Sequence, residues 1–195
     1  MKIKSLLWTF PLASMAFLSG CVTHTTEAVR VQPEINVERQ NIGNQSEVAV
    51  RVIDDRNRTD VGGRNSWSGS TVNIRVADNL TQSIGQQVMA NLAAREFHPV
   101  PYTDNLRRKL IVRILKLSYN QSRGIVTTGT TIDCVMQISA ENNGRTYTKT
   151  YRGGNNLTNV LIPNASADSK AISAAISDSL NHLLDDRKLL DFLAQ

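Results

Sequence analysis

The sequence predicts an α+β domain: an antiparallel or mixed sheet of about five strands with two amphipathic helices on one face. Several segments rich in Val, Ile and Thr alternate apolar and polar residues, which is typical of half-buried strands. Two other segments carry apolar residues at every fourth position, which is typical of helices that cover a core. Asn142-Asn143-Gly144 predicts a tight hairpin turn between the last two strands.

The alternating segments define the expected strands and their buried faces. Ile132, Cys134 and Met136 share one strand face, so Cys134 is expected to be a small buried hydrophobe. The Gly-rich segments 57–70 and 153–156 are expected to be loops. The expected strands are 47–53, 71–76, 110–119, 125–140 and 145–151.

The segments with four-residue spacing define the helices. The first is expected to begin after the cap residue Asp78 and to end near Arg95, and the second to begin at Ser166 or Asp168. A short helical turn is expected at 188–193. The apolar stripes are Leu80, Ile84, Val88 and Leu92 in the first helix and Ile172, Ile176, Leu180, Leu183 and Leu184 in the second.

The first twenty residues have the layout of a secretory signal peptide. Lys2 and Lys4 precede an apolar run at 6–17. That run is shorter than the roughly 20 residues that a permanent membrane-spanning helix needs. Residues 1–20 are therefore expected to be removed on export rather than to anchor the chain.

A lipid-attachment motif follows the apolar run. Leu18-Ser19-Gly20-Cys21 resembles the lipobox of bacterial lipoproteins. The resemblance implies cleavage before Cys21, a diacylglycerol on its thiol and an acyl chain such as palmitate on its amine, with no other cofactor. Such chains anchor a protein stably to a bilayer. Val22 stands where Asp would indicate inner-membrane retention, so the resemblance implies the outer membrane. The domain is expected to face the periplasm, and exposure at the cell surface stays open as the alternative.

The rest of the chain has two expected parts. Residues 21–46 are expected to form a lipidated N-terminus and polar tether, and residues 47–195 a single α+β periplasmic domain. The tether can lie along the domain, and Val31, Ile35 and Val37 in it could form a short edge strand. This length suffices for one core and is too short for two. Loss of Lys2 and Lys4 lowers the net charge from +5 to +3. The remaining basic residues are mostly scattered, so nucleic acid is not an expected partner.

The sequence lacks the residue patterns on which small enzymes depend. Once Cys21 is modified, Cys134 has no partner for a disulfide. His24, His98 and His182 lack the spacing of metal ligands. No nucleophile with a base and no complete phosphate loop is present. We therefore expect a protein that is not an enzyme, with no catalytic residues and no metal.

One charged group stands out as a candidate partner-binding site. Asp54, Asp55 and Arg56 end a strand, and Arg58 and Asp60 follow closely. Two carboxylates near a strand end could hold a cation or transfer protons. The alternative is a solvated strand end in which Asp and Arg residues pair locally, and the same interpretation applies to the segment 185–187 after the second helix.

Trp67 is a second candidate for partner binding. It lies in the polar segment 65–70, and no strand or helix pattern assigns it to the core. A large aromatic residue in such a loop can anchor a partner. It can equally fold back over the sheet.

Several short segments match one known family in order along the mature chain. Besides the lipobox they are Val-Gln-Pro-Glu-Ile at 31–35, Val-Ile-Asp-Asp-Arg at 52–56 with Gly62 beyond it, Glu96-Phe97, the strand 110–119 and Tyr151. With them the chain resembles the YajG-like family of Gram-negative lipoproteins over nearly its whole mature length. Gly is more usual in this family where Glu96 stands. The resemblance implies location and fold only, because the family has no established activity.

Three functional hypotheses follow. The leading one is a non-enzymatic outer-membrane lipoprotein whose domain binds an envelope protein or glycan. The alternative is an accessory factor in lipid or lipopolysaccharide transport or outer-membrane assembly, which an apolar groove between helices and sheet would support. The third is an enzyme that acts on cell-wall material through Asp54, Asp55 and Asp60. The sequence gives no indication of oligomeric state.

Overall fold

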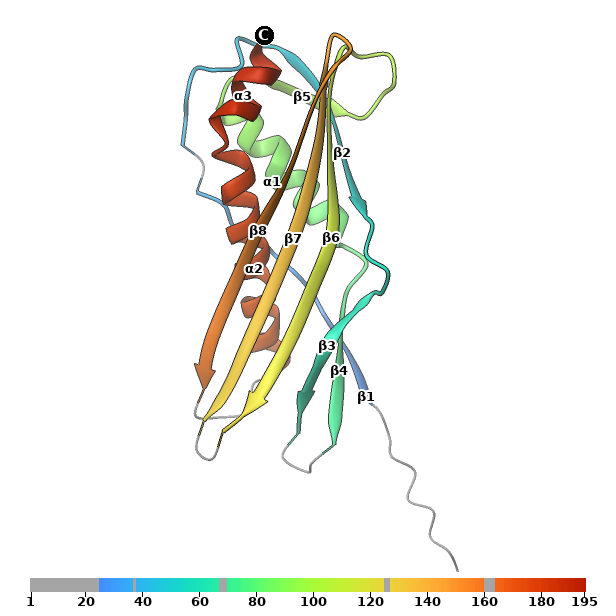
Figure 1. Ribbon diagram of the computed structural model, residues 1–195, viewed down its shortest axis with the longest axis vertical. Helices are drawn as coiled ribbons and strands as arrows, with labels where there is room; N and C mark the ends of the chain where they lie inside the picture. The colour runs from blue at the N-terminus through green and yellow to red at the C-terminus, as the bar shows by residue number, and fades with distance from the viewer. Residues whose placement is uncertain (1–24, 37, 67–69, 125–126, 160–163) are drawn as a thin grey trace, which may run out of the picture.

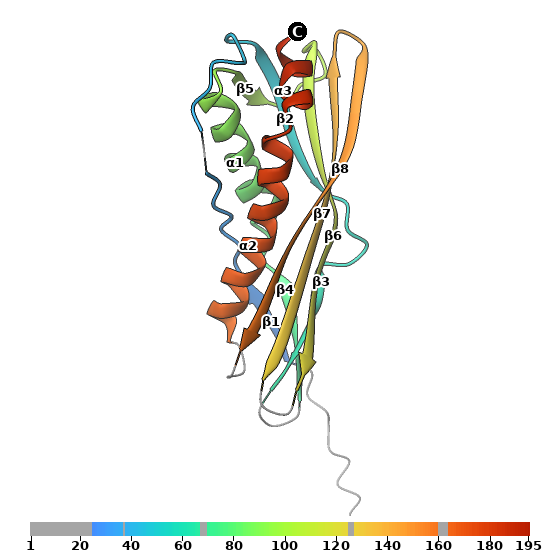
Figure 2. The same cartoon turned by 60° about the vertical axis from the view of Figure 1, so that its left-hand side comes forward.

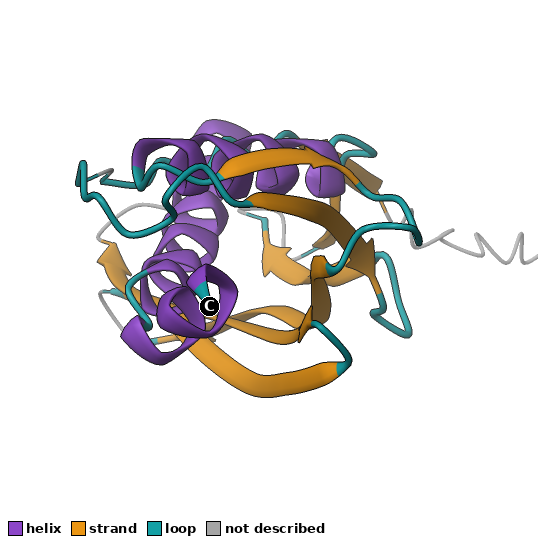
Figure 3. Cartoon of the chain, turned by 90° about the horizontal axis from the view of Figure 1, so that it is seen from above, coloured by secondary structure: helices purple, strands orange, loops and turns teal. Residues whose placement is uncertain are grey.

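The computed structural model describes residues 25–36, 38–66, 70–124, 127–159 and 164–195. In this part of the chain eight strands form one mixed sheet, which curves around three helices (Figures 1 and 3). The α+β class and the mixed sheet are confirmed, but the sheet has more strands than the five expected. The helical turn expected at 188–193 is part of the third helix. The elements are β1 (Thr25–Val29), β2 (Glu47–Asp54), β3 (Asp60–Asn65), β4 (Thr71–Val76), α1 (Leu80–Ala94), β5 (His98–Pro101), β6 (Arg108–Arg123), β7 (Thr128–Asn142), β8 (Arg145–Asn159), α2 (Ala165–Leu184) and α3 (Arg187–Ala194).

A meander of three long strands, β6, β7 and β8, forms the largest part of the sheet. Neighbouring strands in it pair antiparallel along their whole lengths. Asn143 and Gly144 connect β7 to β8 with φ angles of 51° and 78°, as in the type I′ turn that suits the twist of a hairpin. Cys134 of β7 is fully buried, and burial raises the pKa of its thiol to about 12. The expected turn and the core position of Cys134 are confirmed.

The other edge of β6 is shared by two groups of short strands. β2 pairs in parallel with the first half of β6, and β5 pairs with the other edge of β2. β3 pairs with β6 further along, β4 pairs with β3, and β1 pairs with β4. β3 lies within the segment expected to be a loop, because its two glycines interrupt the apolar alternation of a strand. A Cβ atom on Gly62 would lie 2.0 Å from the carbonyl oxygen of Tyr119. Glycine therefore allows β3 and β6 to meet.

α1 and α2 lie on the concave face of the sheet and enclose the core (Figure 2). α1 contacts β2 and β5, and α2 contacts β7 and β8. The apolar stripes expected for both helices are buried, with at most 3% of each residue exposed. α3 adds Leu189, Leu190 and Leu193 to the same core.

The end of α1 explains an unusual residue. Glu96 has a φ of 61°, which is the left-handed conformation. Its N–H donates to the Ala93 carbonyl at 3.0 Å, and the Phe97 N–H donates to the Leu92 carbonyl at 3.1 Å. These are the two bonds of a Schellman motif, in which glycine is favoured at the left-handed position. Glycine would adopt this left-handed conformation without strain, so it is the favoured residue at the position of Glu96.

β8 continues through residues 153–156, so the loop expected there was wrong. Gly153 lies where α2 packs on the strand, and a Cβ atom on it would be 2.2 Å from the Ser179 nitrogen. We expect Gly153→Val to displace α2 from the sheet and to lower the free energy of unfolding by about 1–3 kcal/mol, as overpacked cores do. Urea denaturation measures this change.

Gly154→Val is the matched control for this prediction. Gly154 is exposed, and the nearest atom to a Cβ on it is the Ile132 carbonyl oxygen at 3.2 Å. We expect a smaller loss of stability at this position. Equal losses for the two variants would show that the contact with α2 is not the reason for glycine at 153.

The segment expected to be a tether is folded from Thr25 onward. β1 pairs in parallel with β4, and the chain then continues along α2 as an extended segment, the strap (residues 30–36 and 38–40). Val31 and Pro33 in the strap are buried and Ile35 is half-buried. Alternate strap residues thus face the core.

Candidate functional site

The charged residues at the end of β2 are paired with one another. Arg56 Nε and Nη2 each donate to one carboxylate oxygen of Asp54, both at 2.7 Å. Burial alone would raise the pKa of Asp54, but the hydrogen bonds and charge of Arg56 outweigh it and hold this pKa below its ordinary value. Asp55 lies 3.6 Å from Arg113 Nη1. The structure therefore favours local pairing over a pair of free carboxylates.

A second ion pair lies beside the first. Arg58 Nη2 is 2.7 Å from Asp60 Oδ2, and this hydrogen bond lowers the pKa of Asp60. Arg56 and Arg58 border a cleft of about 560 Å³ between β3 and the bulge of β6, where Leu115 is 36% exposed. In the described part of the chain, no cluster of three or more His, Cys, Asp or Glu side chains could hold a metal ion.

Other predicted site residues fall outside the described ranges. Trp67 is one of them, and the lipid-attachment residues Leu18, Ser19, Gly20 and Cys21 are the others. Their roles stay predictions. The first described strand, β1, begins four positions after Cys21.

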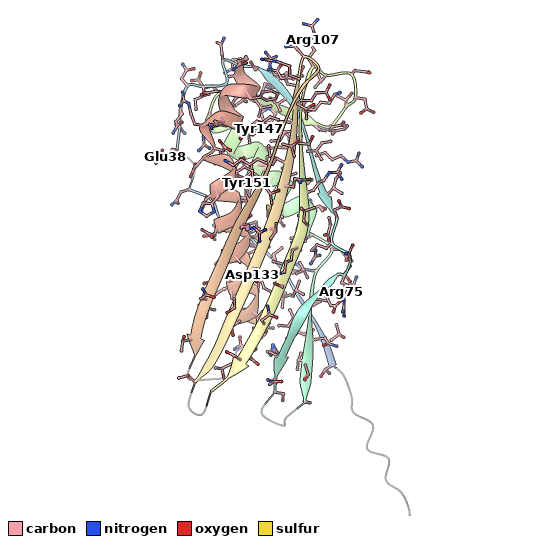
Figure 4. All side chains as sticks on the ribbon, in the orientation of Figure 1. Glu38, Arg75, Arg107, Asp133, Tyr147 and Tyr151 are labelled. Carbon is pink, nitrogen blue, oxygen red and sulfur yellow. The ribbon has the colours of Figure 1, made fainter. Side chains whose placement is uncertain are left out.

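A polar groove runs along the outer side of α2, between this helix and the strap. It consists of two adjoining cavities of about 590 and 450 Å³, which share Asn181. One wall is formed by the even-numbered strap residues Gln32, Glu34, Asn36, Glu38 and Gln40. The other wall carries α2 residues at four-residue spacing, namely Ser169, Ser173, Ser177, Asn181 and, just beyond the helix, Asp185. Figure 4 shows Glu38 on the side of the helices away from Asp133 of β7.

Serine hydroxyl groups of α2 hold the strap in place. Four residues of a helix rise about 6 Å and two residues of extended chain about 6.6 Å. Serines at every fourth helix position therefore stay in register with every second strap residue. The bonds join Ser169 Oγ to the Arg30 carbonyl, Ser173 Oγ to the Gln32 N–H at 3.0 Å and Ser177 Oγ to the Glu34 N–H at 2.9 Å.

Arg95 borders the second cavity, where α1, α2 and α3 meet. Its side chain is 2% exposed, and its Nη2 donates to Asp185 Oδ1 at 2.8 Å. Its Nε and Nη1 are buried without a protein partner, as are both amide atoms of Asn91 one helical turn earlier. An unpaired buried polar group costs about 1–3 kcal/mol. Asp185, expected to be a solvated residue, is the one charged partner of Arg95 among the described residues.

Asp168 fixes the first turn of α2 to the sheet. Its residue is 1% exposed. Oδ1 accepts from the Tyr119 hydroxyl at 2.8 Å and Oδ2 from Arg64 Nη1 at 2.5 Å, and Arg64 also binds Glu27 of β1. Burial raises the pKa of Asp168, although the bonds from Tyr119 and Arg64 act in the opposite direction. This network joins α2 to β1, β3 and β6 and so positions the strap.

Asp186 fixes the other end of α2. It is the N-cap of α3, and its side chain is 6% exposed. Figure 4 shows two of its partners, Tyr147 and Tyr151, on β8. The expectation of a solvated helix end was therefore wrong here. Its carboxylate accepts from Tyr147 Oη at 3.0 Å, Lys149 Nζ at 2.6 Å, Tyr151 Oη at 2.7 Å and the Lys188 N–H at 3.0 Å.

The groove residues were not among the predicted site residues. The signals were present as a polar stripe at four-residue spacing along α2 and as alternate polar residues at 32–40. Each pattern alone is typical of a solvated surface. The groove arises because these segments, about 141 positions apart, are joined by hydrogen bonds.

Comparisons with known proteins place the chain in a family. A model of an uncharacterized lipoprotein family matches residues 33–194, whereas no curated protein matches. A solved structure from Xanthomonas campestris has a TM-score of 0.51 and 13% identity, covering 86% of this chain and 95% of that one. A minor lipoprotein from Acinetobacter baumannii has a TM-score of 0.45 and 11% identity, with 75% and 91% covered. No helix within the described residues is long and apolar enough to span a membrane. The chain belongs to this family of uncharacterized lipoproteins.

Proposed function

We propose that the protein is a non-enzymatic lipoprotein of the outer membrane, anchored through Cys21, whose periplasmic domain binds an envelope glycan. The observation that supports this is the groove between the strap and α2. Its two cavities adjoin end to end, and hydroxyl, amide and charged side chains line them. A glycan strand is extended and rich in hydroxyl groups. Each hydroxyl that leaves water needs a new hydrogen-bond partner. The serine hydroxyls of the groove already bind the strap, so the side chains of Gln32, Lys170 and Asn181 would provide these partners.

The lining favours a glycan over the other occupants. Among the described residues that line the groove, Ala174 and Leu190 are the only apolar ones. Sites for acyl chains are lined mainly by hydrophobic side chains, so the groove does not support lipid transport. The cores of protein interfaces are enriched in aromatic residues and Met, and neither occurs among the lining residues that the structure describes. The side chains of one hydrophobic cluster occupy the space between the helices and the sheet. This is where the transport hypothesis expects an apolar groove.

A photocrosslinking amino acid at position 174 tests the proposal in the living envelope. Ala174 is exposed on the groove wall, whereas Ala167 is exposed on the first turn of α2 outside the groove lining. In the full-length lipidated protein we expect position 174 to give an adduct that glycan hydrolases release. Position 167 is the matched control and should give none. A protein adduct at 174, or no adduct, would contradict a glycan ligand.

Bulky substitutions at the same two positions give a second test. Ala174→Trp should obstruct the first cavity and abolish retention of the protein on isolated cell-wall glycan. Ala167→Trp adds the same side chain to the same helix and should leave retention unchanged. Cosedimentation measures both, and equal retention of the two variants would count against the groove as the binding site.

A further inference from the structure

We infer that the second cavity of the groove is a subsite for the carboxylate of an acidic sugar, and that Arg95 binds this carboxylate. The inference rests on the proposed glycan function and specifies the ligand. It is carried by a buried, half-paired guanidinium that borders a cavity of about 450 Å³. The remaining cavity of the groove would hold the neighbouring sugar units.

The donor count of Arg95 is the first step. A guanidinium has five N–H donors in a fixed plane, and it binds carboxylates through two parallel bonds. Asp185 Oδ1 takes one bond from Nη2, while Nε and Nη1 have no protein partner. The side chain is nevertheless 2% exposed. Arg95 thus retains unused capacity for a planar anionic group.

Asp185 is the second step. Its side chain is 67% exposed, so it can turn into solvent when a ligand arrives. A ligand carboxylate can then take its place on Nη2 and add a second bond to Nη1. Because one carboxylate replaces another, the net charge of the cavity stays the same. Asp185 therefore binds Arg95 only while no ligand carboxylate occupies the cavity.

The other charged residues of the cavity are compatible with this exchange. Glu38 Oε2 accepts from Gln40 Nε2 at 3.3 Å, on the strap. Arg187 Nε donates to Asp191 Oδ1 at 2.9 Å, on the exposed side of α3. Neither is bonded to Arg95. The amides of Asn36 and Asn181 also line the cavity and can bind the hydroxyl and acetamido groups of a sugar.

Two disaccharides of equal length test the inference on the full-length protein. N-acetylglucosaminyl-N-acetylmuramic acid carries a carboxylate, and N,N′-diacetylchitobiose does not. Calorimetric titration should show that the acidic disaccharide binds at least about tenfold more tightly, the effect of one charge-assisted pair. Arg95→Gln should abolish this preference by weakening binding of the acidic disaccharide.

Asp185→Asn is the matched variant, because it breaks the same ion pair but keeps the guanidinium. We expect it to bind the acidic disaccharide more tightly than the unaltered protein does, whereas Arg95→Gln binds it more weakly. Weakening by a similar factor in both variants would show that the pair only maintains the fold, and would overturn the inference. Equal binding of both sugars to the unaltered protein, with loss in Ala174→Trp, would overturn it and leave the glycan function standing. Binding of neither sugar, with no adduct at position 174, would overturn both.

Discussion

Asp168→Asn is expected to lower the free energy of unfolding by about 3–5 kcal/mol, the cost of breaking a buried ion pair from one side. The carboxylate of Asp168 is the buried acceptor of both Arg64 and the Tyr119 hydroxyl. The neutral amide of Asn leaves the Arg64 side chain, which is 12% exposed, without its buried counter-charge. Urea denaturation at neutral pH measures the loss.

Glu27→Gln is the matched control, because Glu27 binds the same guanidinium from its more exposed side. The Glu27 side chain is 33% exposed, against 1% for Asp168. Ion pairs in contact with water contribute about 0–1 kcal/mol, so we expect a loss of less than about 1 kcal/mol. If both variants lost the same stability, burial of Asp168 would not be the source of its effect.

Asp186→Ala is expected to have the second largest effect, a loss of about 2–4 kcal/mol. It removes the cap of α3, which is worth about 1 kcal/mol. It also leaves the hydroxyls of Tyr147 and Tyr151 without their acceptor, at about 1–3 kcal/mol. Asp186→Asn keeps a capping oxygen and an acceptor but loses the charge opposite Lys149, so it should cost less. Thermal and urea unfolding distinguish the two variants.

The charge of Asp186 also predicts a pH dependence. Burial alone would raise its pKa, but the bonds from Lys149, Tyr151 and Tyr147 outweigh it and hold the pKa at about 2. A carboxylate whose pKa is lowered on folding stabilises the protein fully above its unfolded pKa of about 4, and this contribution is lost as the pH falls through about 2. The lowered pKa corresponds to about 2 kcal/mol of such stability, which should be absent in Asp186→Asn. Parallel curves for both proteins between pH 4 and pH 2 would contradict this assignment.

The elements that the sequence predicted well are those whose core contacts follow one local period. α2 buries Ile172, Ile176 and Leu180 at four-residue spacing, and β7 buries every second residue. In both cases one face meets the core along the whole element. The hairpin turn at Asn143 and Gly144 was equally predictable, because the left-handed conformation restricts which residues form it.

The elements that the sequence did not predict depend on distant parts of the chain. β3 contains Gly62 where β6 approaches it closely and Gly63 where β4 does, and β8 contains Gly153 because α2 packs there. From the sequence alone such glycines indicate loops. The strap has the same origin, since its backbone bonds to serines of α2 rather than to a neighbouring strand.

The candidate site was predicted least well, for a related reason. The high density of charge in the sequence predicted a site at Asp54 and Arg56, but these two side chains form an ion pair with each other. Arg95 gave no such signal, because a single arginine near a helix end is usually solvated. Its proposed role depends on its burial beside the second cavity and on its bond to Asp185, about 90 residues away.

The early start of β1 limits how far the domain can stand from a membrane. Three residues separate Cys21 from Thr25, and four Cα steps span at most about 15 Å. A lipid on Cys21 would therefore hold the β1 end of the molecule close to the head groups. α2 leads from Asp168 near β1 to Asp185 at its other end, a rise of about 25 Å. The Arg95 end of the groove would then be carried outward from the bilayer surface, at a height set by the length of one helix.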